Sequence, residues 1–378
     1  MELLTTFLHN ALSFVVIISI IVFIHEFGHY AVAKLSGVKI EAFSIGFGTE
    51  LFGWNDRSGT RWKVSALPLG GYVKMYGDLS AMSMPDEEKI THFTEAEKKI
   101  AFHTKPLAIK AAIVAAGPIA NFILAIVILT FFFSFYGKPF ATPEANVIVK
   151  GSAADEAGLL AGDKITAIDG NSVESFSDIQ RIVSIHPGDA LTFTIKRNDK
   201  ELTKTITPRL SPSKDAFGNP IKVGQLGIAS PKITYQKYSL IPAAGLAIRE
   251  TYNISTTTLK ALGQMITGKR GTEDLGGALR IAEYSGQSVH SGIEATLSFI
   301  ALLSINLGLI NFLPIPLLDG GHLFYYVIEV LTGKPLAERY QRYGFRLGMA
   351  IIATLFILSS FNDIVMIFAR FGHRLFNS

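Results

Sequence analysis

Long stretches with almost no charged residue limit what this chain can fold into more than any other feature of its sequence. A helix needs about 20 apolar residues to cross the roughly 30 Å hydrocarbon core of a bilayer. Only 17% of the 378 residues are charged, against roughly 25% in a typical soluble domain. Windows near the required length occur at residues 12–35, 111–136, 295–313 and 347–361. The sequence therefore predicts a polytopic α-helical membrane protein with four transmembrane helices.

Lysine and arginine are distributed unevenly around the first two predicted spans. The loop between them is rich in both residues, whereas residues 1–11 contain neither. Because short loops rich in Lys and Arg stay in the cytoplasm, we expect this loop on the cytoplasmic side. Both termini and the region 137–294 then lie on the opposite side. The fourth window is followed by Asn362 and Asp363, expected at an interfacial helix end, with a buried functional carboxylate as the alternative.

Residues 143–232 have the pattern of an inserted β-rich domain. Short β-branched or alternating runs are separated there by turn signals such as Asp169-Gly170-Asn171. A connecting segment, 237–268, repeats apolar residues at loosely helical spacing. It is expected to form an amphipathic helix at the membrane surface, and an ordinary packed helix is the alternative.

The first span carries a motif that an ordinary membrane helix lacks. His25, Glu26 and His29 form the pattern H-E-x-x-H. Two histidines four residues apart lie about 40° from each other around a helix, so both imidazoles can reach one metal ion beside Glu26 as a general base. Ionisable side chains at mid-bilayer also need a compensating partner. The motif favours a metal site over a polar helix-packing pair near the membrane edge.

A third metal ligand is expected from the end of the third span, because catalytic zinc sites hold three protein ligands and leave one position open. Residues 311–322 read N-F-L-P-I-P-L-L-D-G-G-H. The two prolines break the helix, and such irregular backbone is tolerated at membrane depth only inside protein or around a water-filled cavity. We therefore predict Asp319 as the third ligand, with a turn carboxylate as the alternative. His322 is expected to be a helix-start residue rather than a fourth ligand.

These motifs resemble those of the site-2 protease family of intramembrane zinc metalloproteases, in the bacterial RseP type (RIP metalloproteases). The resemblance rests on H-E-F-G-H at 25–29, G-P-I-A-N at 117–121 and the run from 311 to 321, and it covers essentially the whole chain. It implies Zn²⁺ held by His25, His29 and Asp319, with Glu26 as the base. It also implies cleavage of single-pass transmembrane proteins, such as anti-sigma factors or remnant signal peptides, in the cell inner membrane, with an active site open toward the cytoplasmic side.

The resemblance also predicts how the chain is divided. Residues 1–136 would hold transmembrane helices 1 and 2 with a membrane-associated β-hairpin, which the segments 46–48 and 65–75 resemble. Trp62, Val64 and Ala66 alternate as in a strand, and that edge can pair with an extended substrate. Residues 292–378 would hold transmembrane helices 3 and 4 with the L-D-G-G motif.

The inserted β-rich region resembles the circularly permuted PDZ domains of bacterial proteases. The resemblance rests on the segments 151–159, 162–165 and 168–170, with 224–228 as the closing strand and carboxylate-binding loop. PDZ domains take peptide C-termini by adding a strand. A domain that binds nothing and only filters access is an equal alternative.

The implied reaction is hydrolysis of a peptide bond in the lipid bilayer. Zinc lowers the pKa of its bound water toward ~7, and Glu26 would take the proton and pass it to the leaving nitrogen. Asn311 and Asn121 are intramembrane amides that can stabilise the oxyanion, hold substrate backbone or only bridge helices. The same ligand set would also accept iron or cobalt.

Two other classes of function are weighed against a protease. One is a non-catalytic membrane scaffold with structural zinc and a peptide-binding PDZ-like domain, which would not need Glu26. The other is a zinc transporter, for which the same residues would form a conduction site. Nucleic acid is excluded as a partner, because the net charge is only +4 and no basic run is interleaved with aromatic residues.

Overall fold

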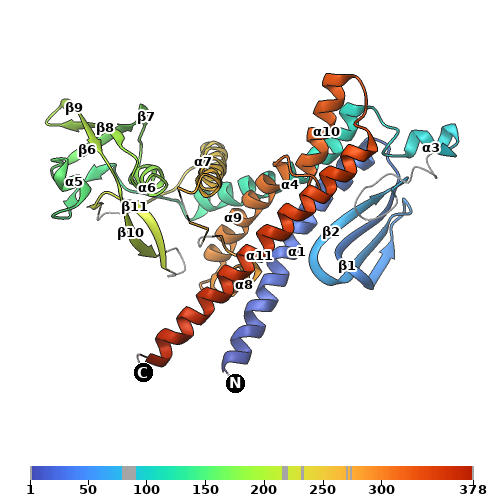
Figure 1. The fold of residues 1–378 in the computed structure, drawn as a ribbon, viewed down its shortest axis with the longest axis horizontal. Coiled ribbons are helices and arrows are strands. Elements are labelled where there is room, and N and C mark those ends of the chain that lie inside the picture. Colours follow the sequence, from blue (N-terminus) through green and yellow to red (C-terminus); the bar gives the residue numbers. More distant parts are fainter. Residues whose placement is uncertain are drawn as a thin grey trace. The chain divides into compact units, whose positions relative to one another are not determined.

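The computed structural model describes residues 2–78, 91–214, 220–230, 234–269, 271–272 and 275–376. Two compact units are present (Figure 1). The first unit combines residues 1–128 with 275–378, and the second consists of residues 129–274. Each unit is described by itself below.

Within the described residues, four helices are long and apolar enough to cross a membrane. They are α1 (Glu2–Leu35), α4 (Leu107–Phe135), α9 (Ile293–Phe312) and α11 (Glu338–Phe376). All four predicted windows are confirmed as apolar helices. Figure 1 shows the first turn of α1 and the last turn of α11 at the same end of the first unit.

The polar residues after the fourth window lie inside α11, so the expectation of an interfacial helix end is wrong. The side chain of Asp363 is 0% exposed. It accepts hydrogen bonds from the main-chain N–H groups of Gly277 and Arg280, each at 3.0 Å, and lies 3.4 Å from Arg280 Nε. These N–H groups begin helix α8 (Ala278–His290) and lack partners within that helix. Asp363 is thus a structural carboxylate that caps α8 from another helix.

Strands β1 (Ile40–Asn55) and β2 (Arg61–Met75) form an antiparallel sheet beside α1. Each strand changes direction within its length, so residues 42–45 pair with both 61–64 and 71–74. Trp62 and Val64 also pair with residues 52–54 and are therefore interior to the sheet. The predicted strand is confirmed, but Trp62 and Val64 do not lie at the expected free edge of the sheet. Among the described residues, the segment 71–75 pairs on one side only and so forms such an edge.

A buried apolar cluster joins this sheet to the helices around it. Its members include Tyr30 and Ala33 of α1, Phe43 and Val73 of the sheet, and Ile113 of α4. Among the described residues, the first unit also contains the helices α3 (Glu95–Ile100) and α10 (Asp319–Thr332). The cluster fixes the C-terminal half of α1 against both the sheet and α4, because closely packed interiors resist rearrangement.

The second unit contains several β-strands within residues 143–232, where the sequence predicts a β-rich domain, together with helices α5 (Ala153–Glu156) and α6 (Phe176–Ser184). A five-stranded sheet has the order β4-β6-β8-β9, with β7 paired to β6. Its strands are β4 (Glu144–Ala145), β6 (Asp163–Ile168), β7 (Asn171–Ser172), β8 (Leu191–Arg197) and β9 (Lys200–Ile206). Separate pairs are formed by β10 (Arg209–Lys214) with β11 (Pro220–Gln225) and by β5 (Val147–Ile148) with β12 (Ile228–Ala229).

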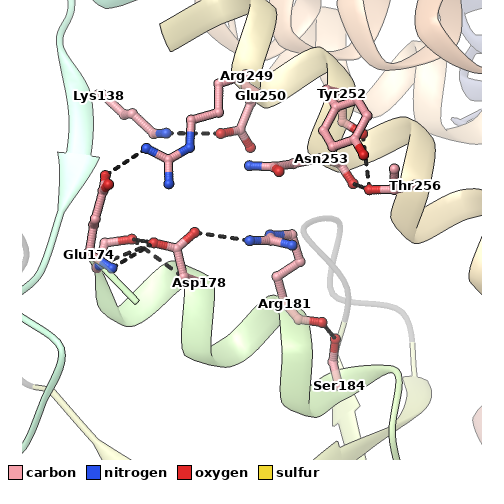
Figure 2. A network of polar contacts seen from close by, with 11 residues as sticks. Lys138, Glu174, Asp178, Arg181, Ser184, Arg249, Glu250, Tyr252, Asn253 and Thr256 are labelled. Atoms are coloured by element: carbon pink, nitrogen blue, oxygen red, sulfur yellow. Dashed lines mark hydrogen bonds and ion pairs between the residues drawn. The ribbon is translucent and has the colours of Figure 1, made fainter. Parts of the chain in front are cut away.

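The two ends of the β-rich module lie together. Strand β3 (Lys138–Phe140), which follows α4, pairs with β13 (Thr234–Gln236), which precedes α7 (Leu240–Ile266). Arg249 of α7 bonds to Glu174 beside α6 at 2.7 Å, and Lys138 bonds to Glu250 at 2.9 Å (Figure 2). Exposed ion pairs of this kind contribute about 0–1 kcal/mol each, so they orient α7 more than they stabilise it.

One buried ion pair closes the loop before β6. Asp163 is 1% exposed, and Arg197 donates to both of its carboxylate oxygens at 2.7 and 2.6 Å. The main-chain N–H of Leu160 donates to the same carboxylate at 2.8 Å. The hydrogen bonds from Arg197 are the main reason that the pKa of the Asp163 carboxyl lies below its usual range.

Replacing Arg197 with methionine should loosen this loop in a pH-dependent way. In the wild type the ionised carboxylate stabilises the fold above about pH 4 and loses that effect only as the pH falls through its lowered folded pKa. Without Arg197 the buried carboxylate keeps only the Leu160 N–H as a partner, so its ionised form destabilises the loop, and protonation relieves this only as the pH falls. Hydrogen exchange of residues 158–163 at pH 5 should be faster in the variant. The exposed pair Lys196–Asp199 provides the control: Lys196→Met should exchange as the wild type does, and equal rates in both variants would contradict the prediction.

Candidate metal centre

The two histidines of the first motif lie where α1 crosses α4 very closely. His25 and His29 are both 9% exposed. A Cβ atom at Gly117 of α4 would stand only 2.2 Å from His29 Nε2, and one at Gly28 would stand 2.3 Å from the main-chain oxygen of Ala116. Only glycine permits this approach of the two helices. The G-P-I-A-N segment therefore provides the space that the His29 imidazole occupies.

Asp319 reaches the histidines from the irregular segment between α9 and α10. Leu317 adopts a φ of +97°, a conformation that is strained for a residue with a side chain. A Cβ atom at Gly320 would stand 2.2 Å from the main-chain oxygen of Leu313. The first turn of α10 can therefore pack against this segment only because glycine follows Asp319. The prolines and glycines of the motif together place the Asp319 carboxylate at the start of a helix.

Three ligand atoms converge at one point. His25 Nε2 lies 3.1 Å and His29 Nε2 3.4 Å from Asp319 Oδ2, and the two imidazole nitrogens lie 3.3 Å apart. Among the described residues, the polar atoms near the buried Asp319 Oδ2 are these two imidazole nitrogens. Three ligands of one tetrahedral zinc ion, each about 2.0–2.1 Å from it, would lie about 3.3–3.4 Å from one another. The spacing of the three atoms fits a bound zinc ion.

The outer nitrogen of each imidazole has a partner on α4. His29 Nδ1 lies 2.8 Å from the main-chain oxygen of Ile113 and must donate to it, because a carbonyl only accepts. His29 Nε2 therefore keeps its lone pair for a metal ion. His25 Nδ1 lies 3.2 Å from Asn121 Nδ2.

A cavity of about 770 Å³ opens onto the three ligand atoms. Glu26, which is 9% exposed, lines it beside the histidines. Asn311 and His322 also line it, and residues 71–73 of β2 form part of its wall. His322 lies in the first turn of α10, as the sequence predicts. Asn121 is 0% exposed and is not among the lining residues; it lies behind His25.

Several residues around the site could not be identified from their own sequence signal. The Ile113 partner of His29 is a main-chain oxygen, which leaves no signature in the residue type. His103 also lines the cavity, and it lies 2.7 Å from Asp78, whose side chain is fully buried. A buried Asp–His pair is visible only once the fold brings the two side chains together.

The sequence matches Peptidase family M50 over residues 13–355. A relative from Agrobacterium fabrum, named as a putative zinc metalloprotease, is 42% identical over 355 residues, which cover 93% of this chain and 94% of the relative. Metalloprotease MmpA of Caulobacter vibrioides is 33% identical over 381 residues, with coverage of 95% and 96%.

A smaller likeness is found among solved structures. The PDZ domain of an SdrC-like protein from Listeria monocytogenes is 25% identical, with a TM-score of 0.18, over 25% of this chain and 90% of that domain. The family match and the two metalloproteases each span more than nine-tenths of the chain, and the range of the family match includes His25, His29 and Asp319. This chain belongs to peptidase family M50.

Proposed function

We propose that this chain is a zinc-dependent endopeptidase that hydrolyses peptide bonds within the membrane-spanning segments of single-pass proteins, such as anti-sigma factors or remnant signal peptides. The observation that carries the proposal is the convergence of His25, His29 and Asp319 at one buried point on a cavity that Glu26 also lines. The name of the Agrobacterium fabrum relative supports zinc as the metal, and the names of both relatives support proteolysis as the reaction.

Glu26 is assigned as the general base. A bound zinc ion supplies an activated water and polarises the scissile carbonyl. Glu26 takes a proton from the water and returns it to the nitrogen of the leaving peptide. Its position one residue after His25 keeps the carboxylate beside the metal ligands without making it one of them. Asn311 is assigned as an amide donor to the substrate backbone or the oxyanion, because it lines the same cavity.

The substrate is proposed to bind in an extended conformation along β2. Residues 71–73 line the cavity, and a Cβ atom at Gly71 would stand 2.9 Å from Glu26 Cγ. The segment 71–75 pairs on one side only among the described residues, so an extended peptide can add to it as a further strand. Strand addition also satisfies the peptide groups that an unwound substrate helix exposes.

The proposed topology has four transmembrane helices in the cell inner membrane. The loop with the β1–β2 sheet and the opening of the active site lie on the cytoplasmic side, because that loop carries the excess of Lys and Arg. The β-rich module and both termini lie on the other side. Helix α7 is proposed to rest on the membrane surface, because Ile241, Ile248 and Tyr252 are exposed on one of its faces.

The β-rich module is proposed to be a circularly permuted PDZ domain. Its glycine-rich loop ends in Gly227, which has a φ of +81°, and the main-chain oxygen of Gly227 accepts from the N–H of Val149 at 2.8 Å. The strand after this loop pairs with β5. A peptide C-terminus would bind beside that strand; a module that only filters access to the membrane is the alternative.

Metal analysis of the purified protein tests the ligand set. His25→Ala and Asp319→Ala should each lose stoichiometric zinc, because two remaining ligands hold the ion weakly. His322→Ala provides a matched control, since it removes an imidazole from the same cavity without removing a ligand, and it should keep its zinc. A stoichiometric zinc content in Asp319→Ala would contradict the proposed centre.

Glu26→Gln separates the protease from a scaffold with structural zinc. The substitution preserves the size of the side chain but removes its capacity to take a proton. Zinc content should stay stoichiometric, while kcat for a transmembrane substrate in detergent should fall about 10²- to 10⁴-fold, the typical contribution of a general base. Unchanged processing by this variant would favour the scaffold.

Substrate variants test the requirement for unwinding. A helical substrate hides its carbonyls in hydrogen bonds, and breaking one in lipid costs several kcal/mol unless a new partner is provided. Gly or Pro near the cut site should therefore increase the cleavage rate in liposomes, and Leu at the same positions should decrease it. Equal rates for the two substrates would exclude unwinding as a determinant.

A further inference from the structure

Asn121 lies directly behind a metal ligand and has an unused hydrogen-bonding group. Its side chain is 0% exposed, and its Nδ2 atom lies 3.2 Å from His25 Nδ1. Its Oδ1 atom is buried and has no hydrogen-bond partner among the described residues. A buried amide oxygen without a partner is unfavourable, so a role for this oxygen has to be sought.

The two histidines have partners of different kinds. The main-chain oxygen beside His29 can only accept, so it holds the His29 proton on Nδ1 whether or not a metal is bound. The amide beside His25 can either donate or accept. In the present arrangement its NH₂ group faces His25 Nδ1, so Nδ1 accepts and the imidazole proton is on Nε2, the nitrogen that lies toward Asp319.

A metal ion requires the opposite arrangement of His25. Coordination uses the lone pair of Nε2, so the single proton of the neutral imidazole must then be on Nδ1. A half-turn of the terminal amide exchanges its oxygen and nitrogen. This rotation brings Oδ1 opposite the new Nδ1–H group, so that Oδ1 gains a partner and the NH₂ group gives up its contact with His25.

We propose that Asn121 is a positioning residue that matches the tautomer of His25 to the presence of the metal. The inference rests on the zinc centre proposed above. With zinc bound, Oδ1 accepts from His25 Nδ1–H and fixes the ring with Nε2 toward the ion. Without zinc, the NH₂ group donates to Nδ1 and keeps the ring in place. Asn121 thus acts through His25 and does not touch the substrate.

Helix α9 holds the backbone of α4 at the level of Asn121. Ser304 of α9 donates a hydrogen bond from Oγ to the main-chain oxygen of Asn121 at 2.8 Å. A Cβ atom at Gly308, one turn later, would stand 3.0 Å from the main-chain oxygen of Pro118. The proposed change at Asn121 is therefore confined to its terminal amide.

Zinc release from the full-length protein in detergent tests the inference. Purified zinc-loaded protein is mixed with excess chelator, and the appearance of free zinc is followed with a dye. Asn121→Leu, which has a similar size but no acceptor, should release zinc about 10- to 100-fold faster than the wild type, the usual effect of removing a partner of a ligating histidine. Asn121→Asp keeps an acceptor in the same place and should release zinc no faster than the wild type.

Ser304→Ala serves as the packing control. It removes a hydrogen bond to the main chain of Asn121 but leaves the amide intact, so its release rate should stay within a few-fold of the wild type. Release from Asn121→Leu at the wild-type rate, or from Asn121→Asp as fast as from Asn121→Leu, would overturn the inference and leave the proposed function untouched. A wild-type protein that holds no stoichiometric zinc would overturn the proposed function and this inference with it.

Discussion

The structure depends on bringing three polar atoms together inside the apolar part of the chain. His25, His29 and Asp319 come from opposite ends of the sequence, and their ligand atoms lie 3.1–3.4 Å apart. Buried ionisable groups are unfavourable unless they are paired or bind a metal ion. The helix crossing at Gly117 and the broken segment before Asp319 both serve this convergence, since each provides a close approach that regular helices with larger residues would prevent.

The lack of hydrogen-bond partners in the lipid bilayer also limits how the substrate can be cleaved. A peptide bond in a membrane helix is shielded by its own hydrogen bonds, so the enzyme must offer other partners before hydrolysis can begin. In the proposed binding mode the segment 71–75 of β2 would provide such partners beside Glu26, because its outer side has no strand paired to it among the described residues. A strand edge next to the candidate metal centre would then join recognition of the unwound chain to cleavage.

The sequence predicts those structural features best that follow a repeated or regularly spaced pattern of residue types. The four apolar helices follow from hydropathy, and the pairing of His25 with His29 follows from helix geometry. Asp319 could be predicted because proline and glycine surround a carboxylate that would otherwise lie in a membrane helix. The fold-dependent features could not be predicted in this way: the edge of the β1–β2 sheet depends on how each strand bends, and the burial of Asp363 depends on the position of α8. The roles of the individual site residues remain predictions from this geometry.

The unequal partners of the two histidines have a consequence for how the site forms. His29 is held in its metal-binding tautomer by a main-chain oxygen that the fold provides in any case. If His25 also had a partner that could only accept, the centre without metal would present two imidazole lone pairs and a carboxylate to one another at about 3 Å. An amide that can donate instead lets His25 direct its proton toward Asp319, which reduces that repulsion. In the proposed arrangement, the amide of Asn121 can thus serve the centre without zinc as a donor and the centre with zinc as an acceptor, which a main-chain oxygen cannot do.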